Sequence, residues 1–113
     1  MSILVPSLIY VGDTFAFDVP AFSDAIGTAI NSGTYTLTWY ARFNTASEGA
    51  VVVGTAEGGG WRVTVPAATT AGFDVGVWTW QAIATYDTLQ FTAGRGQFTV
   101  KASVKYSGTP GAF

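Results

Sequence analysis

VWTWQAIATY, residues 77–86, is the stretch of this chain with the clearest secondary-structure signal. Successive side chains of a β-strand point to opposite faces of its sheet, so every second residue shares a face. One face of this stretch is apolar and carries Trp78, Trp80, Ala82, Ala84 and Tyr86. The other face is mixed and carries Val77, Thr79, Gln81, Ile83 and Thr85. This alternation predicts a central β-strand.

A second stretch of the same kind, TYTLTWYARF, covers residues 34–43. Its apolar face carries Tyr35, Leu37, Trp39, Ala41 and Phe43. Large aromatic side chains opposite small alanines allow two sheets to interdigitate at the density of a normal protein core. The two stretches together predict an all-β domain.

Turn residues divide the chain into about seven such stretches, with a turn every 8 to 12 residues or so. They are residues 1–11, 14–19, 34–43, 50–56, 61–65, 77–86 and 89–106. This spacing is typical of an immunoglobulin-like β-sandwich, and a barrel is the alternative. The absence of repeats and linkers predicts one domain, residues 12–106, with an N-terminal apolar arm or edge strand (1–11) and a C-terminal tail (107–113).

Glycine and proline predict the irregular segments between these strands. We expect a loop over residues 20–33, with one helical turn opened by Ser23 or Asp24 as the alternative. Residues 67–76 should form a crossover with a short helical turn that Thr69 or Thr70 caps. A β-bulge is expected at Gly54, and another at Gly94 and Gly96.

The amino-acid composition argues against catalytic activity and against metal or cofactor binding. The chain of 113 residues has no cysteine and no histidine, so the usual thiolate, general base and metal ligands are missing. The seven carboxylates fall mainly at strand ends and turns, and no spacing nominates a catalytic pair or a calcium loop. The glycine runs lack the features of a phosphate-binding loop. We therefore expect no enzymatic activity, no metal and no cofactor.

Charge and hydropathy indicate which partners the chain meets. Only 11% of its residues are charged and its net charge is −2, which disfavours nucleic acid. Residues 1–11 lack a basic residue and are too short to cross a bilayer, so we expect neither a signal peptide nor a membrane anchor. A hydrophobic content of 49% and a mean hydropathy of +0.35 predict that apolar surface meets other protein chains.

Three regions are candidates for those protein contacts. The mixed face of the central strands has tyrosine and arginine among threonines, as protein interfaces do. The apolar arm and the tail SGTPGAF are each expected to dock on a neighbouring subunit. The predicted partner-binding residues are Ile3, Leu4, Val5, Leu8, Ile9, Tyr10, Tyr40, Arg42, Trp61, Tyr106 and Phe113.

Trp61 also supports an alternative. It stands with Arg62 next to a glycine turn, where an exposed indole stacks on a sugar in carbohydrate-binding modules. A glycan-binding adhesion module using Trp61, Tyr40 and Arg42 is therefore the second hypothesis. The other tryptophans lie on apolar faces and are expected in the core.

A family resemblance becomes visible once the strands are placed. The chain reads GDTFAF at residues 12–17, then YTLTWYARF, WRVTVPAATTAGFDVGVWTWQAIAT and GRGQFTV. It resembles the small immunoglobulin-like virion proteins of tailed bacteriophages, which share a G-D-T-aromatic opening, a V-T-V-x-A-A-x-T-A-x-W/F stretch and a G-x-Y/W-x-W-x-A strand. The resemblance covers about residues 12–100. The fuller loop at 20–33, the arm and the tail depart from that pattern.

What the resemblance implies is a structural role in the virion, which assembles in the cytoplasm of the host bacterium. A capsid decoration or cement protein fits a compact domain best, with the major capsid protein as partner and contacts between copies. A neck, tail, baseplate or fibre protein is the alternative.

Overall fold

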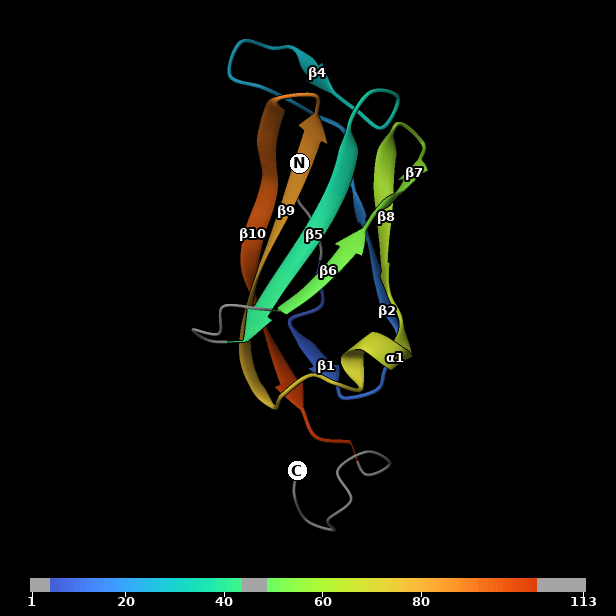
Figure 1. Cartoon of the computed structure of the whole chain (residues 1–113), viewed down its shortest axis with the longest axis vertical. Helices are drawn as coiled ribbons and strands as arrows, with labels where there is room; N and C mark the ends of the chain where they lie inside the picture. Colours follow the sequence, from blue (N-terminus) through green and yellow to red (C-terminus); the bar gives the residue numbers. More distant parts are fainter. Residues whose placement is uncertain (1–4, 44–48, 104–113) are drawn as a thin grey trace.

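The computed structural model describes residues 5–43 and 49–103. Strands dominate it, as the all-β prediction requires (Figure 1). The elements are β1 (Leu8–Tyr10), β2 (Phe15–Val19), β3 (Phe22–Ser23), β4 (Ala29–Ile30), β5 (Thr36–Phe43), β6 (Gly49–Val53), β7 (Thr55–Glu57), β8 (Gly60–Val65), α1 (Ala67–Thr70), β9 (Gly76–Tyr86) and β10 (Leu89–Lys101).

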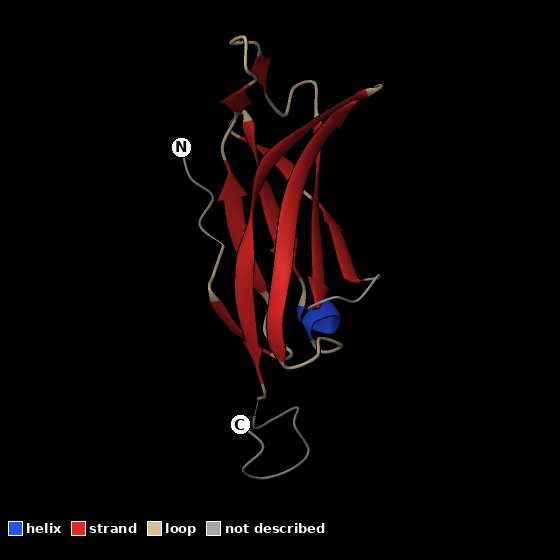
Figure 2. Ribbon diagram, turned by 90° about the vertical axis from the view of Figure 1, so that its left-hand side faces the viewer, coloured by secondary structure: helices blue, strands red, loops and turns tan. Residues whose placement is uncertain are grey.

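The strands form three sheets. The largest has the order β1-β10-β9-β5-β6, the second has the order β2-β8-β7, and β3 pairs with β4. β1 runs parallel to β10, and the other pairs are antiparallel. Figures 1 and 2 show the two larger sheets facing each other, with α1 and the β3–β4 hairpin at opposite ends of the molecule.

The core lies between the two larger sheets and is aromatic. Trp39 of β5 is fully buried, and its ring lies 5.9 Å from Phe15 and 5.8 Å from Phe17, both on β2. Phe98 of β10 stacks on the same indole at 6.0 Å. The predicted apolar faces of 34–43 and 77–86 are thus confirmed as the core face, apart from Tyr86, which is exposed at the end of β9.

Residues 50–56 do not form the single bulged strand that the sequence predicts. The chain leaves the larger sheet after Val53 and enters the smaller one at Thr55. Gly54 stands between them, and its N–H donates to the carbonyl oxygen of Leu37 at 2.8 Å. A Cβ at Gly54 would lie 3.4 Å from the side chains of Leu37 and Trp61, which is ordinary van der Waals contact.

β1 is an edge strand of the larger sheet, which was one of the two alternatives for residues 1–11. The backbone N–H of Thr99 donates to the carbonyl oxygen of Ser7 at 2.9 Å, and that of Val11 donates to Lys101 at 3.0 Å. Ile9 points into the core and is 4% exposed. Residues 8–10 are therefore part of the domain itself.

The segment 20–33, predicted as a loop, contains the β3–β4 hairpin. The carboxylate of Asp24 accepts hydrogen bonds from the N–H groups of Ile26 and Thr28, which closes the turn. Ile30 is fully buried and anchors the hairpin to the core. The helical-turn alternative for this segment is wrong.

The short helix was predicted correctly, but the residue that caps it was not. Pro66 occupies the N-cap of α1, so the expectation of a cap at Thr69 or Thr70 is wrong. Thr70 is instead the last residue of the helix and is buried, and its hydroxyl donates a hydrogen bond to the carbonyl oxygen of Asp13 at 2.8 Å. The Oγ1 of Thr14 accepts a bond from the N–H of Ala67 at 3.0 Å, so α1 is tied to the β1–β2 turn.

The last strand was predicted over residues 89–106. β10 ends at Lys101, and residues 104–106 lie outside the described residues. The predicted bulge is confirmed, because the register with β9 shifts between Thr92 and Gly94.

Gly60 at the start of β8 should not tolerate a side chain. A Cβ there would lie 2.4 Å from the carbonyl oxygen of Val19 and 3.0 Å from the Cα of Pro20, both backbone atoms. We expect Gly60→Ala to lower the free energy of unfolding by about 1–3 kcal/mol, as overpacking does. Urea unfolding of both proteins measures the difference.

Gly72→Ala is the matched control for this substitution. Its Cβ would meet only the carbonyl oxygen of Thr69, at the ordinary distance of 3.7 Å. Its urea midpoint should equal or exceed that of the parent. Equal midpoints for Gly60→Ala and the parent would contradict the predicted clash.

Candidate functional site

The outer face of the five-stranded sheet, the side turned away from the core, carries side chains in rows across the strands. In one row Tyr40 of β5 pairs with Val51 on one side and with Gln81 of β9 on the other, and Gln81 pairs with Arg95 of β10. In the next row Arg42 pairs with Thr79, which pairs in turn with Gln97. This is the mixed face that the sequence nominated as an interface.

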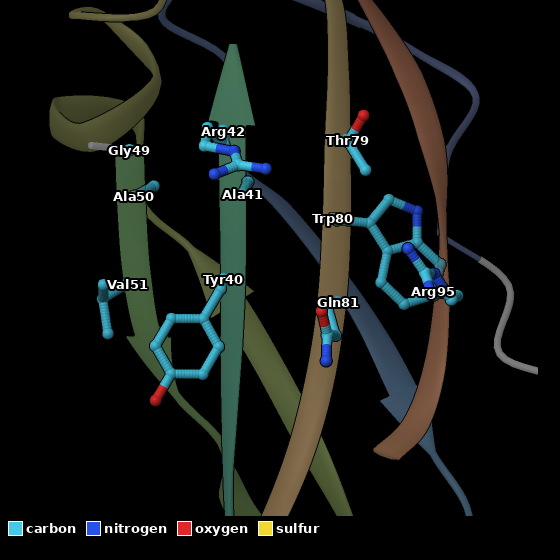
Figure 3. Close-up of a pocket in the computed structure, with 10 residues that line it drawn as sticks. All are labelled: Tyr40, Ala41, Arg42, Gly49, Ala50, Val51, Thr79, Trp80, Gln81 and Arg95. Carbon is cyan, nitrogen blue, oxygen red and sulfur yellow. The ribbon is translucent and has the colours of Figure 1, made fainter. Parts of the chain in front are cut away.

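A hollow of about 590 Å³ lies at the centre of this outer face (Figure 3). Four strands line it, β5, β6, β9 and β10. The side chains that point outward around it are those of Tyr40, Arg42, Val51, Thr79, Gln81 and Arg95. The hollow is therefore open to solvent and lined by aromatic, cationic and amide groups together.

Apolar side chains gather on either side of this centre. Ten large hydrophobic residues are exposed among the described residues, and six of them lie on the outer face. Those six are Leu8, Tyr10, Tyr40, Val51, Val53 and Val77. The outer face therefore holds more of the exposed apolar side chains than the rest of the described surface does.

The charges are divided between the two larger sheets. The five strands of the larger sheet contain no aspartate or glutamate, and they carry the cations Arg42, Arg95 and Lys101. The described carboxylates lie in the smaller sheet or in turns, at Asp13, Asp18, Asp24, Glu57, Asp74 and Asp87. Within residues 5–43 and 49–103, Arg42 and Arg95 form no ion pair.

A second hollow, of about 650 Å³, lies on the smaller sheet and holds two carboxylates. Arg62 Nε is 2.8 Å from Asp18 Oδ1 and 3.2 Å from Glu57 Oε2, so one guanidinium engages both. The hydrogen bond from Arg62 lowers the pKa of Asp18. A general acid for glycoside hydrolysis needs the opposite shift, so Asp18 is not suited to that role.

The Asp18–Arg62 pair gives a testable pH dependence. Because the pKa of Asp18 is lowered in the folded protein, the pair stabilises the fold above about pH 3.9, the ordinary value, and the contribution is lost as pH falls through the folded pKa. Both side chains are exposed, so the effect on stability should be small. We expect Arg62→Gln to raise the Asp18 midpoint in a carbon-13 NMR titration.

Arg42→Gln is the control for that titration, since Arg42 lies on the other sheet. It should leave the Asp18 midpoint unchanged. Identical midpoints in the parent and Arg62→Gln would show that the pair does not act on Asp18.

The structure places two predicted partner-binding residues in the core. Trp61 is 2% exposed, and its Nε1–H donates to the carbonyl oxygen of Tyr35 at 3.1 Å, so it offers no platform for a sugar or a subunit. The reason is parity, because Trp61 alternates with exposed Arg62 and shares the inward face with Val63. Ile9 packs on its own domain and is equally unavailable to a partner.

The other predicted residues divide into three groups. Leu8, Tyr10, Tyr40 and Arg42 are exposed on the outer face. Val5 is half-buried and packs against the core. Ile3, Leu4, Tyr106 and Phe113 lie outside the described residues, so their docking stays a prediction.

Sequence reasoning missed Arg95, Val51 and Val53 as members of this face. Counting back by twos from the inward residue Phe98 reaches Gly96 and Gly94, so Arg95, between them, is expected to point outward. This part of the signal was present in the sequence. That β10 and β6 lie on opposite sides of the β5–β9 pair was not readable from any local pattern.

Three further observations bear on function. Within the part of the chain that the structure describes, no three acidic side chains gather in a metal-binding arrangement. No helix of the described residues has the length and apolar character to span a membrane. The chain matches no protein-family model and no curated protein sequence.

Proposed function

We propose that this chain is a non-enzymatic structural protein of a tailed-bacteriophage virion, a capsid decoration or cement protein that binds and stabilises the lattice of the major capsid protein. The observation that carries the proposal is the outer face, where six exposed apolar side chains lie in and around a hollow that Arg42 and Arg95 also line. Such a face suits a standard protein interface, which buries about 800 Å² per partner. Many weak contacts to the repeated subunits of a lattice raise the overall affinity through effective concentration.

The proposal includes an immunoglobulin-like fold for the two larger sheets. Immunoglobulin sandwiches place strands B, E and D in one sheet and C, F and G in the other, with C′ beside C in the variable type. With β2, β5, β6, β7, β8, β9 and β10 taken as B, C, C′, D, E, F and G, both sheets have this membership. β1 departs from the constant type, because it pairs with β10 rather than with β2.

A binding role without chemistry is supported by the side chains themselves. The chain has no histidine or cysteine, and Arg62 holds Asp18 in its ionised form. The proposed partners are the major capsid protein, other virion subunits and further copies, rather than nucleic acid or membrane. The glycan-binding alternative is weakened because Trp61, the indole on which it relied, is buried.

Cosedimentation with capsid shells tests this function. The purified chain should pellet with shells assembled from the major capsid protein of the same phage, and should raise their melting temperature. Tyr40→Ser combined with Val51→Ser should weaken binding, since both side chains lie exposed in one row of the outer face. Ala16→Ser, on the exposed side of β2, is the matched control and should bind as the parent does.

Absence of the folded parent chain from the pellet would overturn the capsid assignment. Binding that survives the outer-face variant but is lost with Ala16→Ser would show that the smaller sheet is the docking side, and would also overturn it as stated.

A further inference from the structure

We propose that the hollow on the outer face is a carboxylate-binding site, which holds an acidic segment of a partner protein between Arg42 and Arg95. The proposal deepens the proposed function and rests on it, because it names the chemistry of the partner surface. It predicts a segment whose acidic residues are flanked on both sides by apolar residues.

The first argument is the separation of charge. The chain as a whole has a net charge of −2, yet the strands of the larger sheet carry cations and no carboxylate. Within the described residues neither Arg42 nor Arg95 is neutralised by an ion pair. A partner surface that carries negative charge would complement this face.

The second argument is the set of donors at the centre. β9 lies between β5 and β10, and Arg42 and Arg95 stand in neighbouring rows, so they are about 10 Å apart across the sheet and about 7 Å apart along it. Thr79, opposite Arg42, and Gln81, opposite Arg95, lie between them (Figure 3). Guanidinium, hydroxyl and amide groups that converge on one hollow are suited to carboxylate oxygens.

The third argument is the apolar surface on both sides of the hollow. On the side toward the β6 edge lie Tyr40, Val51 and Val53. On the side toward the β1 edge lie Val77 and Leu8, which pair with Thr99 from its two neighbouring strands. A small free anion would leave these side chains in water. An extended or looped protein segment covers them while its carboxylates reach the arginines.

Other occupants fit less well. Three cations on the five strands are too few for the phosphate contacts that sustain nucleic acid binding. A second copy that presents the same face would bring like charges together. The carboxylates of a second copy's smaller sheet are already engaged by Arg62.

Two blocked peptides test the site on the intact chain. One is eight residues long and carries valine, glutamate, glutamate and valine at every second position with serine between them, so that all four share one face of an extended segment. The other replaces each glutamate with glutamine. Nitrogen-15 NMR titration should show amide shifts at Arg42, Thr79, Gln81 and Arg95 with the glutamate peptide. The glutamine peptide should bind at least about tenfold more weakly, because charge-assisted hydrogen bonds are roughly twice as strong as neutral ones. Added salt should weaken only the glutamate peptide.

Variants separate the two arginines from general charge. Arg42→Gln combined with Arg95→Gln should weaken the glutamate peptide about tenfold or more, with an unchanged melting temperature because both side chains are exposed. Arg62→Gln, on the smaller sheet, should bind the peptide as the parent does. Equal affinity for the two peptides, shifts confined to β2 and β8, or no binding at millimolar peptide would overturn the site.

The acidic sugar sialic acid is the competing ligand class. Shifts at Arg42 and Arg95 with sialic acid, and none with the glutamate peptide, would overturn the assignment to a protein partner. The shell assay separates this inference from the proposed function. Peptide binding without shell binding would support the carboxylate site and overturn the capsid role. Shell binding that the double arginine variant leaves unchanged would support the capsid role and overturn the carboxylate site.

Discussion

Replacing Trp39 with alanine should lower the free energy of unfolding by about 3–5 kcal/mol, the range for truncating a large buried aromatic residue. The indole is fully buried and contacts rings from both sheets, Phe15 and Phe17 on one side and Phe98 on the other. The total free energy of unfolding of a small domain is only about 5–15 kcal/mol, so this single substitution should leave the folded state marginally stable. Urea unfolding followed by fluorescence and circular dichroism measures the loss.

Trp39→Phe is the control that separates packing from hydrogen bonding. The Nε1–H of Trp39 is buried with no hydrogen-bond partner among the described residues, so removing it gives up no bond shown there. We expect a loss clearly below that of alanine, because most of the ring contacts remain. If alanine and phenylalanine cost the same, the bridge between the sheets is not the source of the stability.

Replacing Ile9 with alanine should cost about 2–4 kcal/mol, which is large for a residue in a three-residue edge strand. Ile9 is 4% exposed and belongs to the same core cluster as the aromatic residues. β1 is held by its parallel pairing with β10, so the side chain is fixed over the core. Thermal unfolding of the variant should show the loss.

Leu8→Ala is the matched control, since Leu8 is the next residue along and is 45% exposed on the outer face. Its stability should stay within about 0.5 kcal/mol of the parent. A loss as large as that of Ile9→Ala would contradict the register of β1. The pair also separates stability from docking, because only Leu8 is available to a partner.

This placement of Ile9 changes how the arm hypothesis is tested. A deletion that reaches residue 9 removes a core side chain and would lower stability as well as any docking. Point substitutions on the outer face are the cleaner tool, since Tyr40 and Val51 are exposed and contribute little to the core.

The sequence alone was enough to predict which side chains face the core, at Trp39, Trp78, Trp80 and Phe98, and to predict the bulge at Gly94, but not the break at Gly54. Alternation is a local property of an extended backbone, so it can be read residue by residue. The same alternation marked Trp61 as inward, but its neighbourhood next to a glycine turn suggested exposure, and only the packing against Tyr35 and Phe22 decided the matter.

Which strands are neighbours became clear only from the three-dimensional fold. It split residues 50–56 between two sheets, turned residues 8–10 into an edge strand, and brought Arg42 and Arg95 to one hollow without a carboxylate beside them on their five strands. Strand pairing depends on contacts between segments far apart in the chain, and these contacts are selected by the packing of the whole core rather than by any local pattern.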